Sequence, residues 1–415
     1  MPQPDPPRPV PLGRAREFLG LKRSIVGLLV MVVLVGMGER LPERFLPVYL
    51  SSLGGGLAAL GALGGLTNLL GALYSFPGGV LSDRLGFKRA LLVFNFIAMA
   101  GYLIVILIPA WPAVIAGAVL FLSWSAISLP ASMDLVAKSL PKHQRTMGVT
   151  MHSLVRRVPM ALGPIVGGAF IDHWGPVNGV RLAFVAALAM AVFAAIVQQA
   201  LIEAPVPDPA TPKATTSARE LFREMSPPLR SLLVSDILIR FCEQIPYVFV
   251  VLWCMGDERM GIPRAVSGVE FGTLTAIEMT TAVLCYVPVA YFADRVGKKP
   301  FVAATFVFFT LFPLVLLFCR SYWALAGAFV LRGLKEFGEP TRKALIMDLA
   351  PEDRKAGMFG LYYLIRDLVV SLAAVAGAFL WSIAPEANFL AASAFGALGT
   401  MWFVLRGRDV AAAKT

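Results

Sequence analysis

Long apolar runs are the feature that most constrains what this chain can fold into. Each run is about as long as the roughly 20 residues that an α-helix needs to cross a bilayer. Between charged residues and Pro/Gly breaks, the 415 residues contain twelve runs: 24–50, 57–82, 90–110, 112–137, 147–171, 181–203, 231–255, 266–292, 301–319, 322–346, 357–382 and 387–406. The sequence therefore predicts an all-α polytopic membrane protein with twelve transmembrane helices.

Composition excludes several other classes. Hydrophobic residues make up 57% of the chain, only 15% is charged, and the mean hydropathy is +0.72. A soluble domain is about a quarter charged, so a soluble enzyme, a disordered chain and a disulfide-rich secreted domain are excluded. The four cysteines lie in apolar stretches without CxxC spacing, and the three histidines form no HExxH pattern. We expect no disulfide, no metal site and no cofactor.

The net charge of +11 reflects membrane topology better than nucleic-acid binding. Lys and Arg gather in the segments after the second, fourth, sixth, eighth and tenth runs, and such loops face the cytoplasm. We expect an N-terminal tail (1–23) without a cleaved signal peptide, a six-helix bundle (24–203), a polar, proline-rich linker (204–230), a second bundle (231–406) and a tail (407–415). Both termini and the linker are predicted to be cytoplasmic, in a bacterial inner membrane, with the protein a monomer.

The two halves of the chain repeat each other. Asp83 and Arg84 follow the second run, and Asp294 lies 211 residues after Asp83 in a similar Asp-Arg-x-Gly context. Arg157 and Arg366 match at an offset of 209, and an Arg-x-x-Glu pair in the first run recurs in the seventh. Two pseudo-symmetric bundles predict a structure that rocks about a central site.

The loop Gly79-Val-Leu-Ser-Asp83-Arg84-Leu-Gly86-Phe-Lys88-Arg89 resembles motif A of the major facilitator superfamily, with one Phe inserted before the basic pair. The resemblance covers essentially the whole chain and implies a transporter that works by alternating access. In that family the motif A aspartate latches the outward-open state, a role that the resemblance assigns to Asp83. Arg84, Asp294, Arg157 and Arg366 are the further candidates for such a latch.

Two other motifs bear on the direction of transport. Gly163-Pro164-Ile-Val-Gly167-Gly168 resembles the end of motif C of drug–proton antiporters, which favours export. Its small residues also suit close helix packing, so both interpretations stay open. Residues Glu39 to Phe45 resemble the E-x-x-E-R-F motif of proton-coupled peptide symporters, with one extra residue between the glutamates. Motif B of the superfamily places an arginine in the fourth span, but the fourth span of this sequence has none. Arg332 in the tenth span looks like the second-half counterpart of that arginine.

Ionisable residues inside the spans are the main candidates for function, because each costs roughly 2.5–3.5 kcal/mol or more in a membrane. So many can be accommodated only around an aqueous cavity between the halves. The predicted substrate- and proton-binding residues are Glu39, Arg40, Glu43, Arg44, Asp236, Arg240, Glu243, Glu278, Arg332 and Glu336. Structural salt bridges are the alternative, favoured for Glu270, Arg342 and Lys343.

The sequence thus predicts a non-enzymatic secondary transporter of a small charged or zwitterionic organic solute, driven by proton antiport. Glu43 and Glu243 are the hypothesised carriers of the coupling proton, with Arg40 and Arg240 tuning them. Three alternatives stay open: a proton-coupled symporter of an organic anion or peptide-like solute, a lipid or lysolipid flippase, and a membrane-embedded transferase. No H-x-x-x-x-D pair, DxxDD cluster or Gly-rich phosphate loop supports the transferase.

Overall fold

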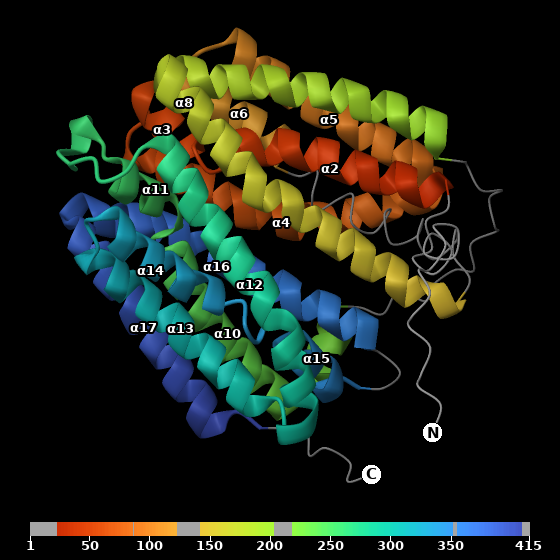
Figure 1. Ribbon diagram of the computed structural model, residues 1–415. Helices are drawn as coiled ribbons and strands as arrows, with labels where there is room; N and C mark the ends of the chain where they lie inside the picture. Colours follow the sequence, from red (N-terminus) through yellow and green to blue (C-terminus); the bar gives the residue numbers. More distant parts are fainter. Residues whose placement is uncertain (1–22, 86, 123–141, 203–217, 352–354, 409–415) are drawn as a thin grey trace, which may run out of the picture.

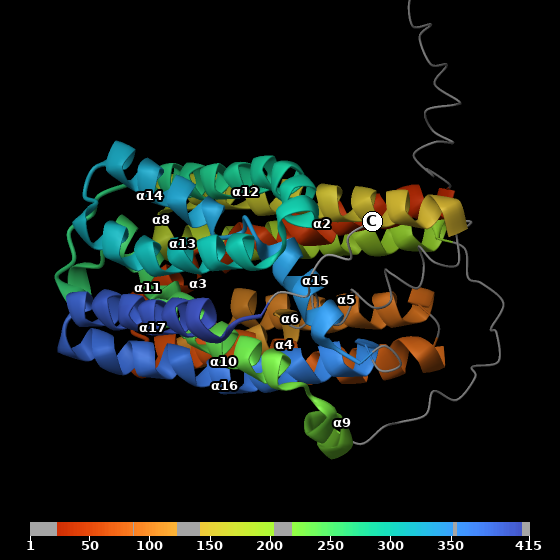
Figure 2. The same ribbon diagram turned by 90° about the horizontal axis from the view of Figure 1, so that it is seen from below.

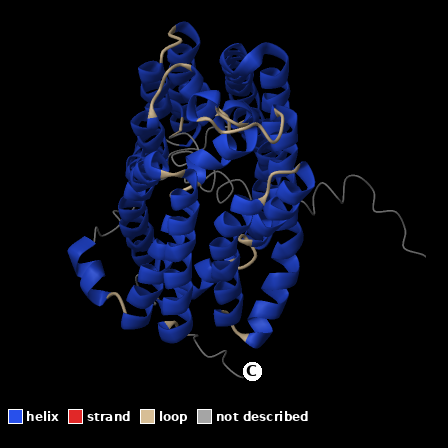
Figure 3. Cartoon of the chain, turned by 90° about the vertical axis from the view of Figure 1, so that its left-hand side faces the viewer, coloured by secondary structure: helices blue, strands red, loops and turns tan. Residues whose placement is uncertain are grey.

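The computed structural model describes residues 23–85, 87–122, 142–202, 218–351 and 355–408. Within these ranges the chain is helical, and the one pairing of extended backbone is an isolated antiparallel bridge between Asp257 and Ile262 (Figure 3). The predicted all-α class is confirmed.

The described helices of the first half account for five expected spans and the beginning of the fourth. α8 bends at Gly175, whose φ of +76° suits a residue without a Cβ, and thereby supplies two spans. The helices are α2 (Arg23–Glu43), α3 (Leu46–Ser52), α4 (Leu57–Leu85), α5 (Phe87–Leu107), α6 (Trp111–Phe121) and α8 (Lys142–Leu201).

The second half contains the other six expected spans and a short helix, α9, inside the predicted linker. Its elements are α9 (Ala218–Glu224), α10 (Pro227–Gln244), α11 (Tyr247–Met255), η1 (Glu258–Met260), α12 (Gly268–Val296), α13 (Lys299–Phe318), α14 (Tyr322–Leu334), α15 (Glu339–Leu349), α16 (Lys355–Ile383) and α17 (Pro385–Arg406). By length and composition alone, six helical stretches of the described chain could cross a membrane, among them 227–255 and 385–406.

Three spans are broken in the middle. The first breaks between α2 and α3, the seventh between α10 and α11, and the tenth between α14 and α15. Prolines explain where the helices restart: Pro47 and Pro340 lie in the first turns of α3 and α15, and Pro246 immediately precedes α11. Proline fits the first turn of a helix but cannot continue the hydrogen-bond ladder of the preceding one. Most of the charged residues predicted for function lie within a turn of these breaks.

The two halves pack along two long seams. α8 lies against α12, and α4 lies against α16 (Figure 2). The halves converge at the end that carries α3 and α11 and spread apart toward the opposite end, where α2 begins and α17 ends (Figure 1). We call these the closed end and the terminal end.

Small residues allow α8 to approach α2 within the first half and α12 across the first seam. A Cβ on Gly167 would overlap the backbone oxygen of Leu41 in α2, and a Cβ on Gly168 would overlap that of Gly268 in α12. Gly163 lies against Arg40, and Pro164 lies against Gly272. Backbones can touch at this distance only where side chains are absent.

Candidate functional site

The broken helices surround a central cavity of about 290 Å³ between the two halves. Charged side chains dominate its wall, with Thr67, Gln244, Tyr247, two methionines and Pro164 between them. The charged members are Arg40, Arg44, Arg157, Arg240, Glu243, Glu278, Lys335 and Glu336. Seven of these eight residues belong to the sequence-predicted set of binding and latch residues; Lys335 does not.

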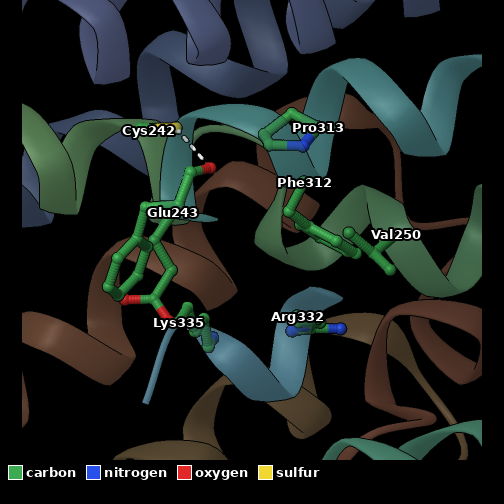
Figure 4. Close-up of a pocket in the computed structure, with 8 residues that line it drawn as sticks. Cys242, Glu243, Val250, Phe312, Pro313, Arg332 and Lys335 are labelled. Carbon is green, nitrogen blue, oxygen red and sulfur yellow. Dashed lines mark hydrogen bonds and ion pairs between the residues drawn. The ribbon is translucent and has the colours of Figure 1, made fainter. Parts of the chain in front are cut away.

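A chain of ion pairs runs along the second-half wall. The Glu243 carboxylate accepts hydrogen bonds from Arg240 Nη1 and Lys335 Nζ, both at 2.5 Å. Lys335 Nζ also lies 3.7 Å from Glu278 Oε1, which is 3.3 Å from Arg332 Nε. Figure 4 shows Lys335 beside Glu243, with Arg332 on the adjacent turn of α14. Lys335 therefore connects the two carboxylates, from the break between α14 and α15.

Three contacts join the two halves at the cavity. Arg44 Nη2 lies 3.8 Å from Glu278 Oε2, and the Arg44 guanidinium lies 5.5 Å from the centroid of the Tyr247 ring. Asn68 Nδ2 donates to Gln244 Oε1 at 3.1 Å. Glu278 Oε2 is buried and accepts no hydrogen bond from the described residues. Arg44 is therefore the cation from the opposite half that compensates this oxygen.

The Arg-x-x-Glu repeat has the same geometry in both halves. Arg40 forms an ion pair with Glu43, as Arg240 does with Glu243. Glu43 is not part of the cavity wall, whereas Glu243 is. Glu39 is buried, with 6% of its surface exposed.

The cavity wall is electrostatically asymmetric. The first half contributes three arginines, and all three carboxylates come from the second half together with Arg240 and Lys335. Five cations thus face three anions, and the cationic surplus remains when Glu43 is added. Such a wall can hold an anionic group against the first half and a cationic group against the second.

Asp236 belongs to a different cluster, inside the second half. It is fully buried, forms an ion pair with Arg342, lies 3.5 Å from Arg366 Nη1 and accepts a hydrogen bond from the Tyr362 hydroxyl at 3.1 Å. Asp236, Arg240 and Glu243 form a stripe on one face of α10, at positions i, i+4 and i+7, but only the last two reach the cavity wall. Arg366 likewise lies in this cluster, whereas its repeat counterpart Arg157 lines the cavity.

A set of polar contacts joins the halves at the closed end. The Asp172 carboxylate, from α8, accepts hydrogen bonds at 2.8 Å from the backbone N–H groups of Gly268 and Val269, and one at 3.1 Å from Arg264. It therefore caps the first turn of α12 from the opposite half. Ser51 donates to Asp257, and Arg259 donates to the backbone oxygens of Ser51 and Ser52.

The sequence analysis did not identify Asp172. It lies at the end of an apolar run, where a single acid is ordinary, and no spacing links it to Gly268. The side chains of Asp83, Arg84 and Asp294 lie outside the described part of the structure, so their predicted latch roles stay predictions. Among the described residues, no three His, Cys, Asp or Glu side chains are grouped so that they could hold a metal ion.

Two pseudo-equivalent bundles of membrane-spanning helices around a charged central cavity are the architecture of a secondary transporter. The family model of the Major Facilitator Superfamily matches residues 28–263 and 232–415, so the chain belongs to this superfamily.

The chain is similar to a curated relative and to solved structures at low sequence identity. An uncharacterised MFS-type transporter of Methanocaldococcus jannaschii is 23% identical over 374 residues, which cover 85% of this chain and 87% of the relative. The fold is similar to that of a bacterial homologue of the human lysosomal transporter Spinster, captured inward-facing and unoccupied, with a TM-score of 0.69, 16% identity and coverage of 93% and 96%. It is also similar to a peptide transporter in complex with alafosfalin, with a TM-score of 0.73, 16% identity and coverage of 93% and 94%.

Proposed function

We propose that this protein is a proton-coupled secondary transporter of a small zwitterionic or anionic organic solute. The observation that carries the proposal is the asymmetric cavity wall, with arginines alone among the charged groups of the first half and all three carboxylates in the second. The anionic group of the solute would bind Arg40, Arg44 and Arg157. A cationic group, where present, would bind near Glu243 and Glu278.

The cavity favours a small polar solute over a lipid. Eight of the fourteen lining residues are charged, and an acyl chain beside them would desolvate these charges without offering a hydrogen bond in return, at a cost in free energy. The volume of about 290 Å³ is near the lower end of ligand pockets. A flippase of lipids or lysolipids is therefore disfavoured.

The ion-pair chain supports coupling to protons. The Arg44–Glu278 contact joins the two halves, so a rocking motion would separate these groups and change the charge around Glu278. Lys335 would transmit that change to Glu243, because it contacts both carboxylates. A carboxylate whose cationic partner moves with conformation is what coupling to protonation requires. We propose that Glu278 and Glu243 bind and release the coupling proton, and we rank Glu43 after them for the same role.

The proposed direction is export in exchange for protons, and it rests on the GPxxGG resemblance. We also propose that the terminal end faces the cytoplasm, as the loop charges indicate. A membrane-impermeant thiol reagent added to intact cells should label a cysteine introduced at exposed Glu258 and leave one at Thr215 unlabelled. The opposite pattern would invert the proposed topology.

Proteoliposomes test the substrate and the coupling together. Size-matched anionic, zwitterionic and cationic solutes are offered under an imposed pH gradient, with solute uptake and proton flux recorded. We expect movement of anions or zwitterions only, with protons moving in the opposite direction. Transport of the cationic solutes alone would contradict the proposed substrate class.

The variants Glu278→Gln and Glu243→Gln imitate the protonated carboxylates. They should abolish gradient-driven accumulation and leave downhill counterflow measurable. Glu386→Gln, at an exposed acid in the first turn of α17, is the matched control and should behave like the wild type. Undiminished accumulation in both cavity variants would show that neither acid couples transport.

A further inference from the structure

A second hollow lies on the outside of the second half, where α10 begins and α17 ends. It is a groove of about 660 Å³. Three exposed arginines line it: Arg230 on α10, Arg406 in the last turn of α17, and Arg408 just beyond. None of the described residues that line the groove is acidic. Its charge therefore suits an anion.

The floor of the groove has an amphipathic aromatic side chain. The Trp402 indole N–H donates to Ser231 Oγ at 3.1 Å, which ties α17 to α10. The Arg406 guanidinium lies 4.7 Å from a Trp402 ring centroid. Tryptophan flanked by arginine is typical of the membrane–water interface, where the ring meets both acyl chains and headgroups.

The surface next to the groove is apolar. Val234 in its wall is 41% exposed, and Leu405 and Met401 on α17 are 74% and 55% exposed. α10 and α17 belong to stretches long and apolar enough to cross a membrane, and the groove lies at their ends. A ligand in the groove would thus have arginines around its polar part and apolar side chains beside the rest.

We propose that this groove binds the headgroup of an anionic phospholipid, with the phosphate held by Arg230, Arg406 and Arg408 and the acyl chains lying along α10 and α17. Guanidinium groups bind phosphate through paired N–H donors, and basic pockets between helix ends are the usual sites for anionic headgroups. The site is separate from the central cavity, so the proposal is independent of the transported solute.

Native mass spectrometry of the full-length protein in detergent, titrated with phosphatidylglycerol or phosphatidylcholine, tests the proposal. The wild type should retain phosphatidylglycerol in preference to phosphatidylcholine. The double variant Arg406→Gln/Arg408→Gln should bind phosphatidylglycerol roughly 30-fold more weakly, since each basic residue near a membrane surface contributes about fivefold. Lys343→Gln with Arg89→Gln removes the same charge from exposed positions outside the groove and should leave binding unchanged.

The proposal would be overturned if the wild type retained the two lipids equally, or if the groove and control variants lost the same affinity for phosphatidylglycerol. It would also be overturned if equimolar glycerophosphate displaced all of the bound phosphatidylglycerol. That displacement would identify a site for a soluble phosphate instead of a lipid. Trp402→Phe provides an independent measurement. Brominated phosphatidylglycerol bound in the groove should quench the fluorescence of Trp402, so the quenching of the protein's tryptophan fluorescence should fall when the Trp402 indole is removed. Unchanged quenching would place the lipid elsewhere.

Discussion

Replacing Asp172 by alanine is expected to open the closed end of the molecule. The carboxylate accepts two backbone hydrogen bonds at the first turn of α12 and one from Arg264 across the interface between the halves. These contacts exist only while α8 and α12 lie together at this end. Their loss would therefore destabilise the observed conformation relative to one in which the closed end is open.

The size of the effect follows from the contacts. Removing a helix cap costs about 0.5–2 kcal/mol, and the Arg264 side chain is 59% exposed, so its ion pair adds about 0.5 kcal/mol. A total of about 2 kcal/mol changes the ratio of open to closed molecules roughly 30-fold. Asp172→Asn keeps one acceptor oxygen and should produce about half of this free-energy change.

Alkylation of a cavity cysteine measures the rare open state. Thr67→Cys places a thiol in the cavity wall, in a background without the four native cysteines. An impermeant maleimide is added only on the side of the closed end. Its reaction rate is proportional to the open population and should rise up to roughly 30-fold in Asp172→Ala.

Glu270→Ala is the matched control for this experiment. Glu270 completes a capping box with Ser267 within α12 itself, so its loss weakens the same helix terminus equally in both conformations. Labelling should then stay at the wild-type rate. Equal acceleration by Glu270→Ala and Asp172→Ala, or no acceleration by either, would refute the idea that Asp172 holds the halves together.

Three further predictions concern stability and the motif A loop. Asp236→Ala leaves buried arginines without their partner and should lower the free energy of unfolding by about 3 kcal/mol, whereas Lys343→Ala, at a side chain that is 51% exposed, should change it by less than about 0.5 kcal/mol; thermal unfolding in detergent compares them. Gly167→Ala should lower the unfolding temperature because its methyl group meets α2, and Gly360→Ala, with open space around its Cα, should not; equal effects would contradict the packing argument. Asp83→Asn should reduce transport sharply with normal membrane insertion, and a wild-type transport rate would leave the loop only a topological role.

The sequence alone determined the features that depend on local composition. Span length, the polar linker and the repeat of the halves follow from hydropathy and spacing along one chain. The cost of charge in a membrane is enough to single out residues such as Arg40, Arg240 and Glu278, because each interrupts an apolar run. Proline alone does not tell where a span breaks, because Pro288 and Pro313 lie inside the continuous helices α12 and α13.

Only the tertiary structure decided which charges meet. Asp236 and Glu243 share a stripe of one span, yet the rotation and break of that span bring Glu243 to the cavity and Asp236 to Arg342. Lys335, at the break between α14 and α15, joins Glu243 of α10 to Glu278 of α12, and Asp172 caps a helix nearly a hundred residues further along the chain. Such partners are set by how helices pack and cross, and packing depends on side chains far apart in sequence.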